Sequence, residues 1–341
     1  MRNNAVVILE PGTIVTKDIG IRELKPGHAR VAVKAIGICG SDINYFKGGA
    51  QTKIPYPLVI GHEISGEITE INGAQDEFKI GDHVVVSPYS PCGNCYPCSQ
   101  NRSNCCVNIQ VYGTHIDGCA MEWCDMPMNC LIKAPRDMAW TKAVLAEPYA
   151  IALHGVSRLR LKKGEHVAII GAGAIGSLSA VAAIPVGAIP IMLDIADAKL
   201  KRASDYGVKH TINVKTEDAK SRISDITGGR MAEAVMEISG ANQSVIDSLQ
   251  YVTNAGRVIL TGWAKSPLEL DTRIITRKEL DVLGQRNTDR AEIARALNDI
   301  YTDQVNISQL VTKTIRFDEM PAMIQRMASH PDENIKVVAT L

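Results

Sequence analysis

Residues 162–184 join a buried strand, a glycine-rich turn and an apolar helix pattern in one uninterrupted run. The strand ends in VAII, the turn is GAGAIG (171–176), and the helix follows at once. A bare GxGxxG pattern has little specificity, but between a strand and a helix it indicates a phosphate-binding turn in a parallel α/β sheet. The run therefore constrains this part of the chain to a nucleotide-binding type of α/β fold.

Strands and helices continue to alternate after this run. Residues 188–195 read as a buried strand and 197–207 as a helix that ends at Gly207, and KHTINV, EAVMEISG and GRVILTGW follow at βα spacing. Such alternation predicts a doubly wound parallel sheet with helices on both faces, a Rossmann domain, which we place at residues 152–287. Pro185 is expected to end the first helix.

The glycine turn has the chemistry of a dinucleotide site. Its glycines allow the tight turn, a close approach of a pyrophosphate and close helix–strand packing, and the helix start offers free N–H groups to phosphates. The candidate cofactor contacts in the turn are Gly171, Gly173, Ala174, Ile175 and Gly176.

Asp194 lies at the end of the next strand, 18 residues after Gly176. A carboxylate there accepts hydrogen bonds from a ribose 2′-hydroxyl and repels a 2′-phosphate, so we predict NAD rather than NADP. Lys199 is a further candidate contact with the ribose. Two simpler interpretations stay open: Asp194 as a helix cap and Lys199 as a solvated charge.

The first 150 residues have a different character. Short β-prone runs at 29–38, 66–73 and 81–88 are separated by Gly and Pro turn signals. After residue 288, a helix at 289–302 precedes two strand-like runs, LVTKTIRF and IKVVATL. We expect this tail to return to the first part, so that residues 1–151 and 288–341 form one β-rich domain.

Four cysteines follow one another as C-x2-C-x2-C-x7-C: Cys92, Cys95, Cys98 and Cys106. Four thiolates brought together by short loops predict a closed tetrahedral zinc site. A disulfide cluster is the alternative, but nothing at the N-terminus resembles a secretion signal, which favours a reducing cytoplasm. Cys105 lies outside this spacing, although it is easily confused with its neighbour.

A second, sparser set of metal-binding side chains lies around this lobe. It contains Cys39, His62, Glu63 and Glu147, with the hydroxyl of Ser41 close to the cysteine. Three protein ligands and one open position make a catalytic type of zinc site. Considered singly, the cysteine is equally consistent with inert core and the histidine with an ordinary hydrogen-bonded side chain.

Composition narrows the classes of function. The 341-residue chain has a formal net charge of +0 and only 4% aromatic residues, which argues against nucleic-acid binding, including a zinc-ribbon module. Its apolar runs are too short for a membrane span. The expected partner is a small molecule, without nucleic acid or membrane.

These motifs together resemble the zinc-dependent medium-chain alcohol and polyol dehydrogenases. The matching segments cover nearly the whole chain in the family's order: GICGSD (37–42), GHEISGEI (61–68), GDHVVV (81–86), the four-cysteine lobe, DGCAMEW (117–123), AEPYAIALHG (146–155) and GAGAIG. The resemblance implies a GroES-like catalytic domain beside the Rossmann domain, with one catalytic and one structural zinc per subunit. Cys119 departs from the family, which usually has a second glycine there.

The resemblance also implies roles for individual residues. Two catalytic zinc ligands are matched by Cys39 and His62, and the third by Glu147, by Glu63 or by both. Ser41 matches the hydroxyl that passes the substrate proton toward solvent. The four spaced cysteines match the ligands of the structural zinc. Zinc in such members polarises the substrate hydroxyl while NAD takes the hydride.

Two segments, GTHIDG (113–118) and LGQRNT (283–288), resemble members that act on L-gulonate or L-galactonate. Arg286 matches an arginine near substrate and nicotinamide, and Tyr45 and His115 are expected near the same site. The alternatives are a structural ion pair for Arg286 and simple packing for Tyr45 and His115.

Sorbitol or another polyol is the alternative substrate. A non-catalytic NAD-binding sensor is the alternative class of protein. The family also implies a homodimer or homotetramer.

Overall fold

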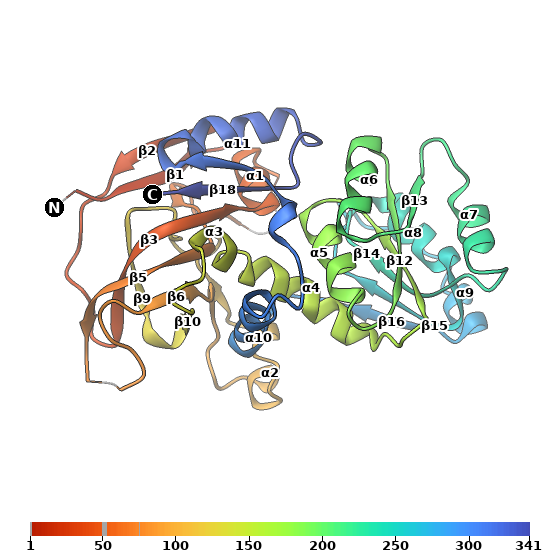
Figure 1. Ribbon diagram of the computed structural model, residues 1–341, viewed down its shortest axis with the longest axis horizontal. Helices are drawn as coiled ribbons and strands as arrows, with labels where there is room; N and C mark the ends of the chain where they lie inside the picture. Colours follow the sequence, from red (N-terminus) through yellow and green to blue (C-terminus); the bar gives the residue numbers. More distant parts are fainter. Residues whose placement is uncertain (1, 50–52, 75) are drawn as a thin grey trace. The chain divides into compact units, whose positions relative to one another are not determined.

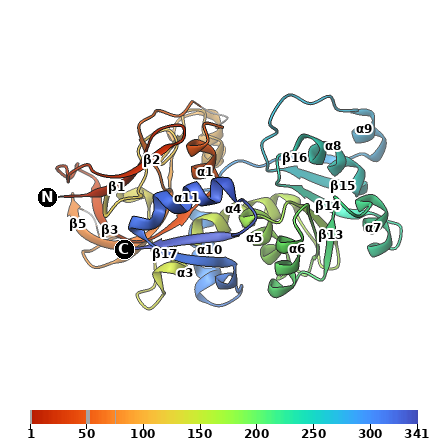
Figure 2. The same cartoon turned by 90° about the horizontal axis from the view of Figure 1, so that it is seen from above.

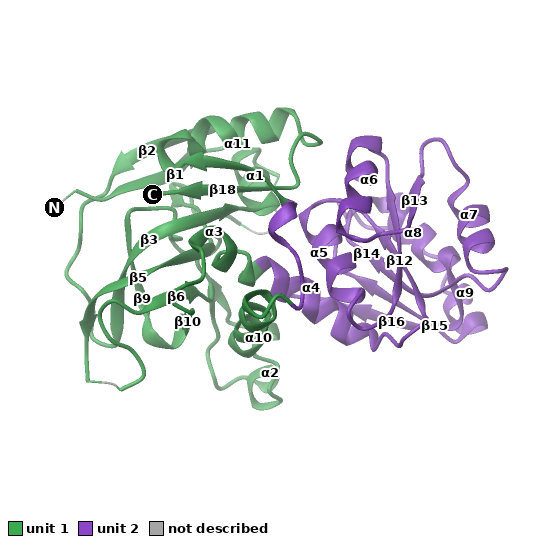
Figure 3. Ribbon diagram, in the orientation of Figure 1, with its two compact units in different colours: residues 1–147, 287–303, 311–341 green, residues 148–286, 304–310 purple. Residues whose placement is uncertain are grey.

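The computed structural model describes residues 2–49, 53–74 and 76–341 (Figure 1). The chain forms two compact units (Figure 3). Unit 1 comprises residues 1–147, 287–303 and 311–341, and unit 2 comprises residues 148–286 and 304–310. The chain therefore leaves unit 1 after its first 147 residues and returns to it for its C-terminal segment.

Unit 1 is built on a seven-stranded sheet in the order β10-β6-β5-β3-β18-β17, with β9 also paired to β3. A smaller sheet has the order β2-β1-β4, and β7 pairs with β8 in a two-stranded ribbon. The strands are β1 (Asn4–Glu10), β2 (Thr13–Asp18), β3 (His28–Ile38), β4 (Leu58–Val59), β5 (Glu63–Asn72), β6 (His83–Val86), β7 (Tyr89–Ser90), β8 (Gln110–Val111), β9 (Trp123–Pro127), β10 (Leu131–Lys133), β17 (Val311–Arg316) and β18 (Lys336–Thr340).

The helices of this unit are short, except near the C-terminus. They are α1 (Gly40–Phe46), α2 (Tyr96–Ser99), α3 (Trp140–Ala143), α10 (Arg290–Tyr301) and α11 (Met320–Ser329). Buried β-branched residues such as Val31, Ile36 and Ile64 form the core between the sheets, and Ile324 of α11 packs into the same cluster. Because β-branched side chains fit a pleated surface, these runs form strands rather than helices.

The long strand β3 lies at the centre of unit 1. It pairs antiparallel with β5 on one side, where Gly37 lies opposite Glu63, and with β18 on the other, where Ile38 lies opposite Val337. The C-terminal strand is thus part of the sheet that begins with residue 28. This register brings the end of β3 and the first residues of two other strands to one place.

Unit 2 contains a six-stranded parallel sheet in the order β13-β12-β11-β14-β15-β16. Its strands are β11 (His166–Ile170), β12 (Ile189–Asp194), β13 (His210–Asn213), β14 (Ala232–Glu237), β15 (Val252–Leu260) and β16 (Asp281–Gly284). The helices are α4 (Ala146–Leu159), whose first two residues belong to unit 1, α5 (Ala174–Ala183), α6 (Asp197–Ala203), α7 (Ala219–Ile226), α8 (Asn242–Tyr251) and α9 (Arg273–Lys278).

Helices cover both faces of this sheet. Helices α5 and α6 lie on one face and α8 on the other (Figure 2). The strand order runs outward in both directions from β11, which is the arrangement of a doubly wound fold. The fold class predicted from the sequence, a GroES-like domain with a Rossmann domain, is therefore confirmed.

Two helices differ from the prediction. The helix expected at 197–207 is α-helical only to Ala203 and continues as a 3-10 turn, before Gly207 at φ 93° reverses the chain. Helix α11 was not predicted at all, although Met320, Met323, Ile324 and Met327 show the helical spacing and are buried. The end of α5 before Pro185 agrees with the prediction. In the described part of the chain, no helix combines the length and apolar character needed to span a bilayer.

Candidate functional site

The end of β3 is the place where the candidate metal ligands gather. Cys39 follows β3 directly, Glu63 begins β5, and Lys336 begins β18. Gly37 leaves the space that the Glu63 carboxylate fills, since a Cβ on Gly37 would lie 1.9 Å from Glu63 Oε2. The sheet register and one missing side chain thus bring residues from three distant segments together.

His62 joins this group through a turn that requires glycine. Gly61 has φ 91°, and a Cβ there would lie 2.8 Å from Ala120. The ligand atoms of Cys39, His62 and Glu63 all lie within 4.8 Å of one another. Such a group of thiol, imidazole and carboxylate has the ligand chemistry of a zinc site.

Asp42 supports this group from α1. Its Oδ2 accepts a hydrogen bond of 2.9 Å from the Cys39 backbone N–H, and its Oδ1 lies 3.8 Å from His62 Nδ1. A carboxylate beside the second ring nitrogen is the usual way to orient a metal-binding histidine. The sequence motif contained Asp42, but sequence reasoning gave it no role.

The electrostatics of the group favour a cation. Burial alone would lower the pKa of His62, but its contacts with Cys39 and the charges of Asp42 and Glu147 together outweigh burial, and the net pKa lies well above the usual value. Burial raises the pKa of Asp42. Surroundings that draw a proton onto a partly buried imidazole are strongly negative, and a divalent cation would neutralise them. The residues present therefore fit a bound zinc.

Glu63 has a second partner that sequence reasoning missed. It forms a buried ion pair with Lys336, whose Nζ also donates to the Ile38 carbonyl at 3.1 Å. Burial alone would lower the pKa of Lys336, but Glu63, Cys39 and Glu147 together outweigh burial, and the net pKa is raised. The sequence signal that could have indicated this role was the single lysine, Lys336, directly before the strand-like run VVAT. A buried cation of this kind holds the carboxylate in place and offsets part of its charge.

Glu147 lies in the first turn of α4 and is only 2% exposed. Its Oε1 accepts a hydrogen bond of 2.5 Å from the Tyr89 hydroxyl. Burial raises the pKa of Glu147 to about 7. The charge of His62 acts against this rise, whereas the charge of Glu63 adds to it. Among the described residues, Glu147 lies outside the group of three donors within 4.8 Å. It is thus a near neighbour, with one oxygen held by a tyrosine.

The other candidate catalytic and substrate residues have varied surroundings. Ser41 Oγ is buried and makes no hydrogen bond within the described residues. The Tyr45 hydroxyl contacts Thr114 Oγ1 at 3.0 Å, and His115 Nδ1 accepts from the Val111 backbone N–H at 3.1 Å. Arg286, the last residue of the first segment of unit 2, is exposed. The contact at Val111 indicates that His115 has at least a structural role.

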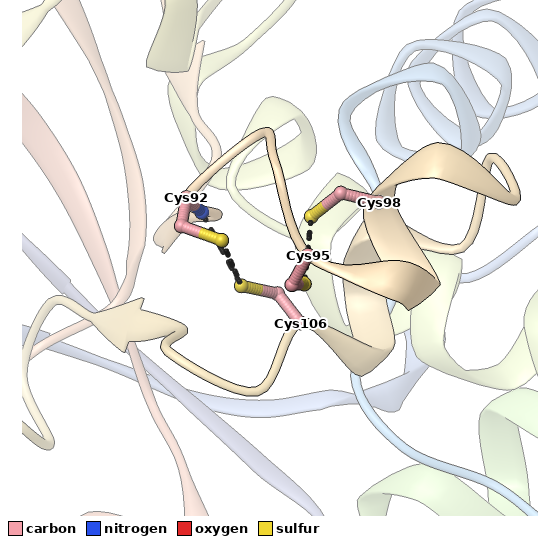
Figure 4. A group of neighbouring side chains, drawn as sticks. All are labelled: Cys92, Cys95, Cys98 and Cys106. Atoms are coloured by element: carbon pink, nitrogen blue, oxygen red, sulfur yellow. Dashed lines mark hydrogen bonds between the residues drawn. The ribbon is translucent and has the colours of Figure 1, made fainter.

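The four spaced cysteines form the second group. Their sulfur atoms all lie within 4.8 Å of one another, and the Cys92–Cys106 and Cys95–Cys98 sulfur pairs are each 3.5 Å apart (Figure 4). All are free thiols, which rules out the disulfide alternative in this structure. The Cys98 backbone N–H is the main cause that lowers the pKa of Cys95, to about 6. Cys105 does not belong to the group.

The glycine turn of unit 2 has the geometry that its sequence suggested. Gly171 has φ 109°, Gly173 caps the N-terminus of α5, and a Cβ on Gly176 would lie 1.8 Å from the Gly171 carbonyl oxygen. A Cβ on Gly173, by contrast, would meet nothing within 4 Å. The third glycine is therefore required by packing, whereas the second faces open space where phosphates can approach.

Asp194, at the end of β12, supports this turn. Its Oδ2 accepts from the Ala172 backbone N–H at 2.7 Å and its Oδ1 from the Ala196 backbone N–H at 2.9 Å. Each carboxylate oxygen keeps a further lone pair, so a ribose hydroxyl can still donate to it. Lys199, in α6, is partly buried. Asp194 thus has a structural role, and its contact with the ribose stays a prediction.

Comparisons with known proteins agree with this architecture. Residues 25–136 match the alcohol dehydrogenase GroES-like domain, and residues 174–302 match the zinc-binding dehydrogenase domain. An uncharacterized zinc-type alcohol dehydrogenase-like protein of Haemophilus influenzae is 43% identical over 99% of this chain and 98% of its own length. The L-galactonate-5-dehydrogenase of Escherichia coli is 29% identical over 99% of this chain and 98% of its own length.

A solved structure shows the same likeness. The putative zinc-binding dehydrogenase of Sinorhizobium meliloti, bound to NADP, has a TM-score of 0.93 and 27% identity, with full coverage of both chains. The chain belongs to the zinc-type alcohol dehydrogenase family. It is an oxidoreductase of CH–OH groups that works with a nicotinamide cofactor and zinc.

Substitutions of the second and third glycines of the turn should have different consequences. Gly176→Ala places a Cβ against the Gly171 carbonyl, and overpacking of this kind costs about 1–3 kcal/mol. Gly173→Ala should leave the thermal unfolding midpoint unchanged but weaken NADH binding, because its methyl group occupies the space open to phosphate. Thermal unfolding and calorimetric NADH titration measure the two effects. A Gly176→Ala protein with wild-type unfolding and binding would contradict the packing role.

Proposed function

We propose that this chain oxidises a secondary hydroxyl of a sugar acid or polyol, reversibly and with NAD as hydride acceptor. L-Gulonate and L-galactonate are the first candidates, and sorbitol or a related polyol is the alternative. The observation that carries the proposal is the group formed by the partly buried Cys39 and His62 and the buried Glu63, with Glu147 near it. The relation to the L-galactonate-5-dehydrogenase of Escherichia coli supports the choice of candidates.

We assign the two metal sites as follows. Cys39 and His62 hold the catalytic zinc together with Glu147 or Glu63, and Cys92, Cys95, Cys98 and Cys106 hold the structural zinc. The four thiols form a closed set with no position for a substrate, whereas the other set leaves one position open. We retain residues 1–151 and 288–341 as the catalytic domain and 152–287 as the NAD-binding domain, in a homodimer or homotetramer.

In the proposed reaction, the substrate hydroxyl loses a proton and its carbon loses a hydride. When bound, zinc supplies Lewis-acid polarisation of the hydroxyl, and the nicotinamide supplies the hydride acceptor. Ser41 accepts the hydroxyl proton and passes its own hydroxyl proton toward solvent, a relay role for which its buried oxygen without a hydrogen bond in the described structure is available. Asp42 keeps His62 oriented, and Lys336 restrains Glu63.

The donor chemistry supports a polar substrate. A carboxylate in place of a second thiolate makes a metal site harder and more tolerant of water and hydroxyl groups. The exposed guanidinium of Arg286 can bind a substrate carboxylate in a two-point contact. Both features favour a sugar acid over a simple apolar alcohol.

The direct test is NAD reduction by the purified zinc-loaded protein across a panel of aldonates and polyols. We expect turnover with at least one aldonate, loss of activity after the catalytic zinc is removed with EDTA, and recovery when zinc is added. Full activity in a preparation shown to lack catalytic zinc would contradict the mechanism. A protein that binds NAD and zinc but oxidises no member of the panel would instead be a sensor.

Arg286→Ala should separate the two substrate classes. Loss of a charge-assisted contact costs about 1.5–3 kcal/mol, so kcat/KM for an aldonate should fall by roughly ten- to a hundredfold. For a neutral polyol of the same length it should change little. Steady-state kinetics with matched pairs, such as an aldonate and its alditol, measure the difference. Equal losses on both substrates would remove the carboxylate role from Arg286.

Asp194→Asn tests the cofactor preference. It removes the negative charge and keeps only one of the two side-chain oxygens, so that the N–H of either Ala172 or Ala196 loses its acceptor. We expect the ratio of kcat/KM with NAD to that with NADP to fall by about tenfold, or about 1.4 kcal/mol. The NADP bound to the Sinorhizobium meliloti relative makes this comparison informative. An unchanged ratio would show that Asp194 only braces the glycine turn.

A further inference from the structure

Tyr89 connects the four-cysteine lobe to the buried carboxylate of the candidate catalytic site. It lies in β7, which pairs with β8 so that Tyr89 is opposite Val111. Its ring packs on the small core of the lobe, formed by Cys106, Ile109 and Val111. Its hydroxyl donates to Glu147 Oε1 at 2.5 Å. One side chain therefore has its ring in one candidate metal site and its polar end at the other.

The four-cysteine group controls where the ribbon lies. Cys92 follows β7 by two residues, and Cys106 precedes β8 by four. Their sulfur atoms lie 3.5 Å apart, and the Cys92 backbone N–H donates to Cys106 Sγ at 3.2 Å. A two-stranded ribbon this short has little stability of its own. A metal held by both cysteines would fasten the two strands at their base and so fix Tyr89.

The two carboxylates near the candidate catalytic site have different partners. Glu63 is held by the cationic Lys336, whereas Glu147 is held by the neutral hydroxyl of Tyr89. A cation competes with a metal for the charge of a carboxylate. A neutral donor leaves that charge in place, and it restrains only one of the two oxygens. Glu147 Oε2 is therefore the oxygen that remains for a metal.

We infer that Tyr89 is a positioning residue that orients Glu147 for the catalytic metal and makes that metal's affinity depend on the four-cysteine lobe. The inference rests on the proposed assignment of Glu147 as a metal ligand. Hydrogen-bond partners of metal ligands typically change metal affinity by about 10- to 100-fold when removed. The ring of Tyr89 transmits the position of the lobe, and its hydroxyl fixes the carboxylate.

The test measures zinc affinity rather than turnover. The catalytic zinc is called the second zinc here, and the four-cysteine lobe keeps the structural zinc during the measurement. In the full-length protein, the zinc content per chain and competition with a chelator give the affinity of the second zinc. Tyr89→Phe keeps the ring and removes the hydroxyl, so we expect about 10- to 100-fold weaker binding of the second zinc only. Tyr206→Phe is the matched control, because it removes a buried tyrosine contact of 2.9 Å to Ser177 in unit 2.

The double variant distinguishes this inference from the proposed function. If the hydroxyl acts through Glu147, Tyr89→Phe should have no further effect in a Glu147→Gln background. Weaker second-site binding in Glu147→Gln with unchanged binding in Tyr89→Phe would overturn the role of Tyr89 and leave the ligand assignment intact. Unchanged binding in both single variants would overturn the assignment of Glu147, and the inference with it.

A third arm tests the dependence on the lobe and needs no change at Tyr89. Cys98→Ser weakens the lobe site, and we expect it to weaken the second zinc as well. If Cys98→Ser leaves the second-site affinity unchanged, the coupling through the ribbon is wrong. This comparison decides the question even if Tyr89→Phe fails to fold.

Discussion

The pairing of β3 with β5 on one side and β18 on the other is the constraint on which the candidate catalytic site depends. It places Gly37 opposite Glu63 and Ile38 opposite Val337. A shift of either register by one residue would turn the side chains of the strand to the other face of the sheet. Lys336 therefore reaches Glu63 only when the last strand has joined a sheet that begins about 300 residues earlier. Such long-range pairing forms slowly, because the entropy of closing a long loop is lost before the new contacts stabilise the pair.

This architecture concentrates buried charge. Asp42, Glu63 and Glu147 are each at most 2% exposed, and Lys336 is the buried ammonium beside them. Burying an unpaired ionised group costs several kcal/mol, so a site with more carboxylates and thiolates than cations is costly until a metal neutralises it. Metal binding and local stability are then linked, because the free energy of binding relieves this cost.

Sequence reasoning found what has a local pattern. The glycine turn with its strand and helix, the spacing of the four cysteines and the βα alternation depend on residues close in sequence. Cys39 and His62 were candidates on ligand chemistry alone, but only the motifs of a known family gave them the role of zinc ligands, because their separation in sequence is not diagnostic. The roles of Lys336 and Tyr89 were missed, since each is defined by a strand register that joins distant segments. Helix α11 shows another failure: four buried apolar residues at helical spacing were present, but the strand-like runs on either side dominated the interpretation.

The two candidate metal groups differ in how far apart their residues lie in the sequence. A closed set of four thiolates can be encoded in fifteen consecutive residues, Cys92 to Cys106, because short loops suffice. A site with an open position needs ligands from separate segments, and each must be held by something other than the metal. Lys336 does this for Glu63 from the main sheet, and Asp42 of α1 faces the His62 ring at 3.8 Å without a hydrogen bond in the described structure. Tyr89 holds Glu147 from a two-stranded ribbon that is too short to be stable alone. A metal bound by the nearby cysteines, which are close in sequence, would make that ribbon rigid.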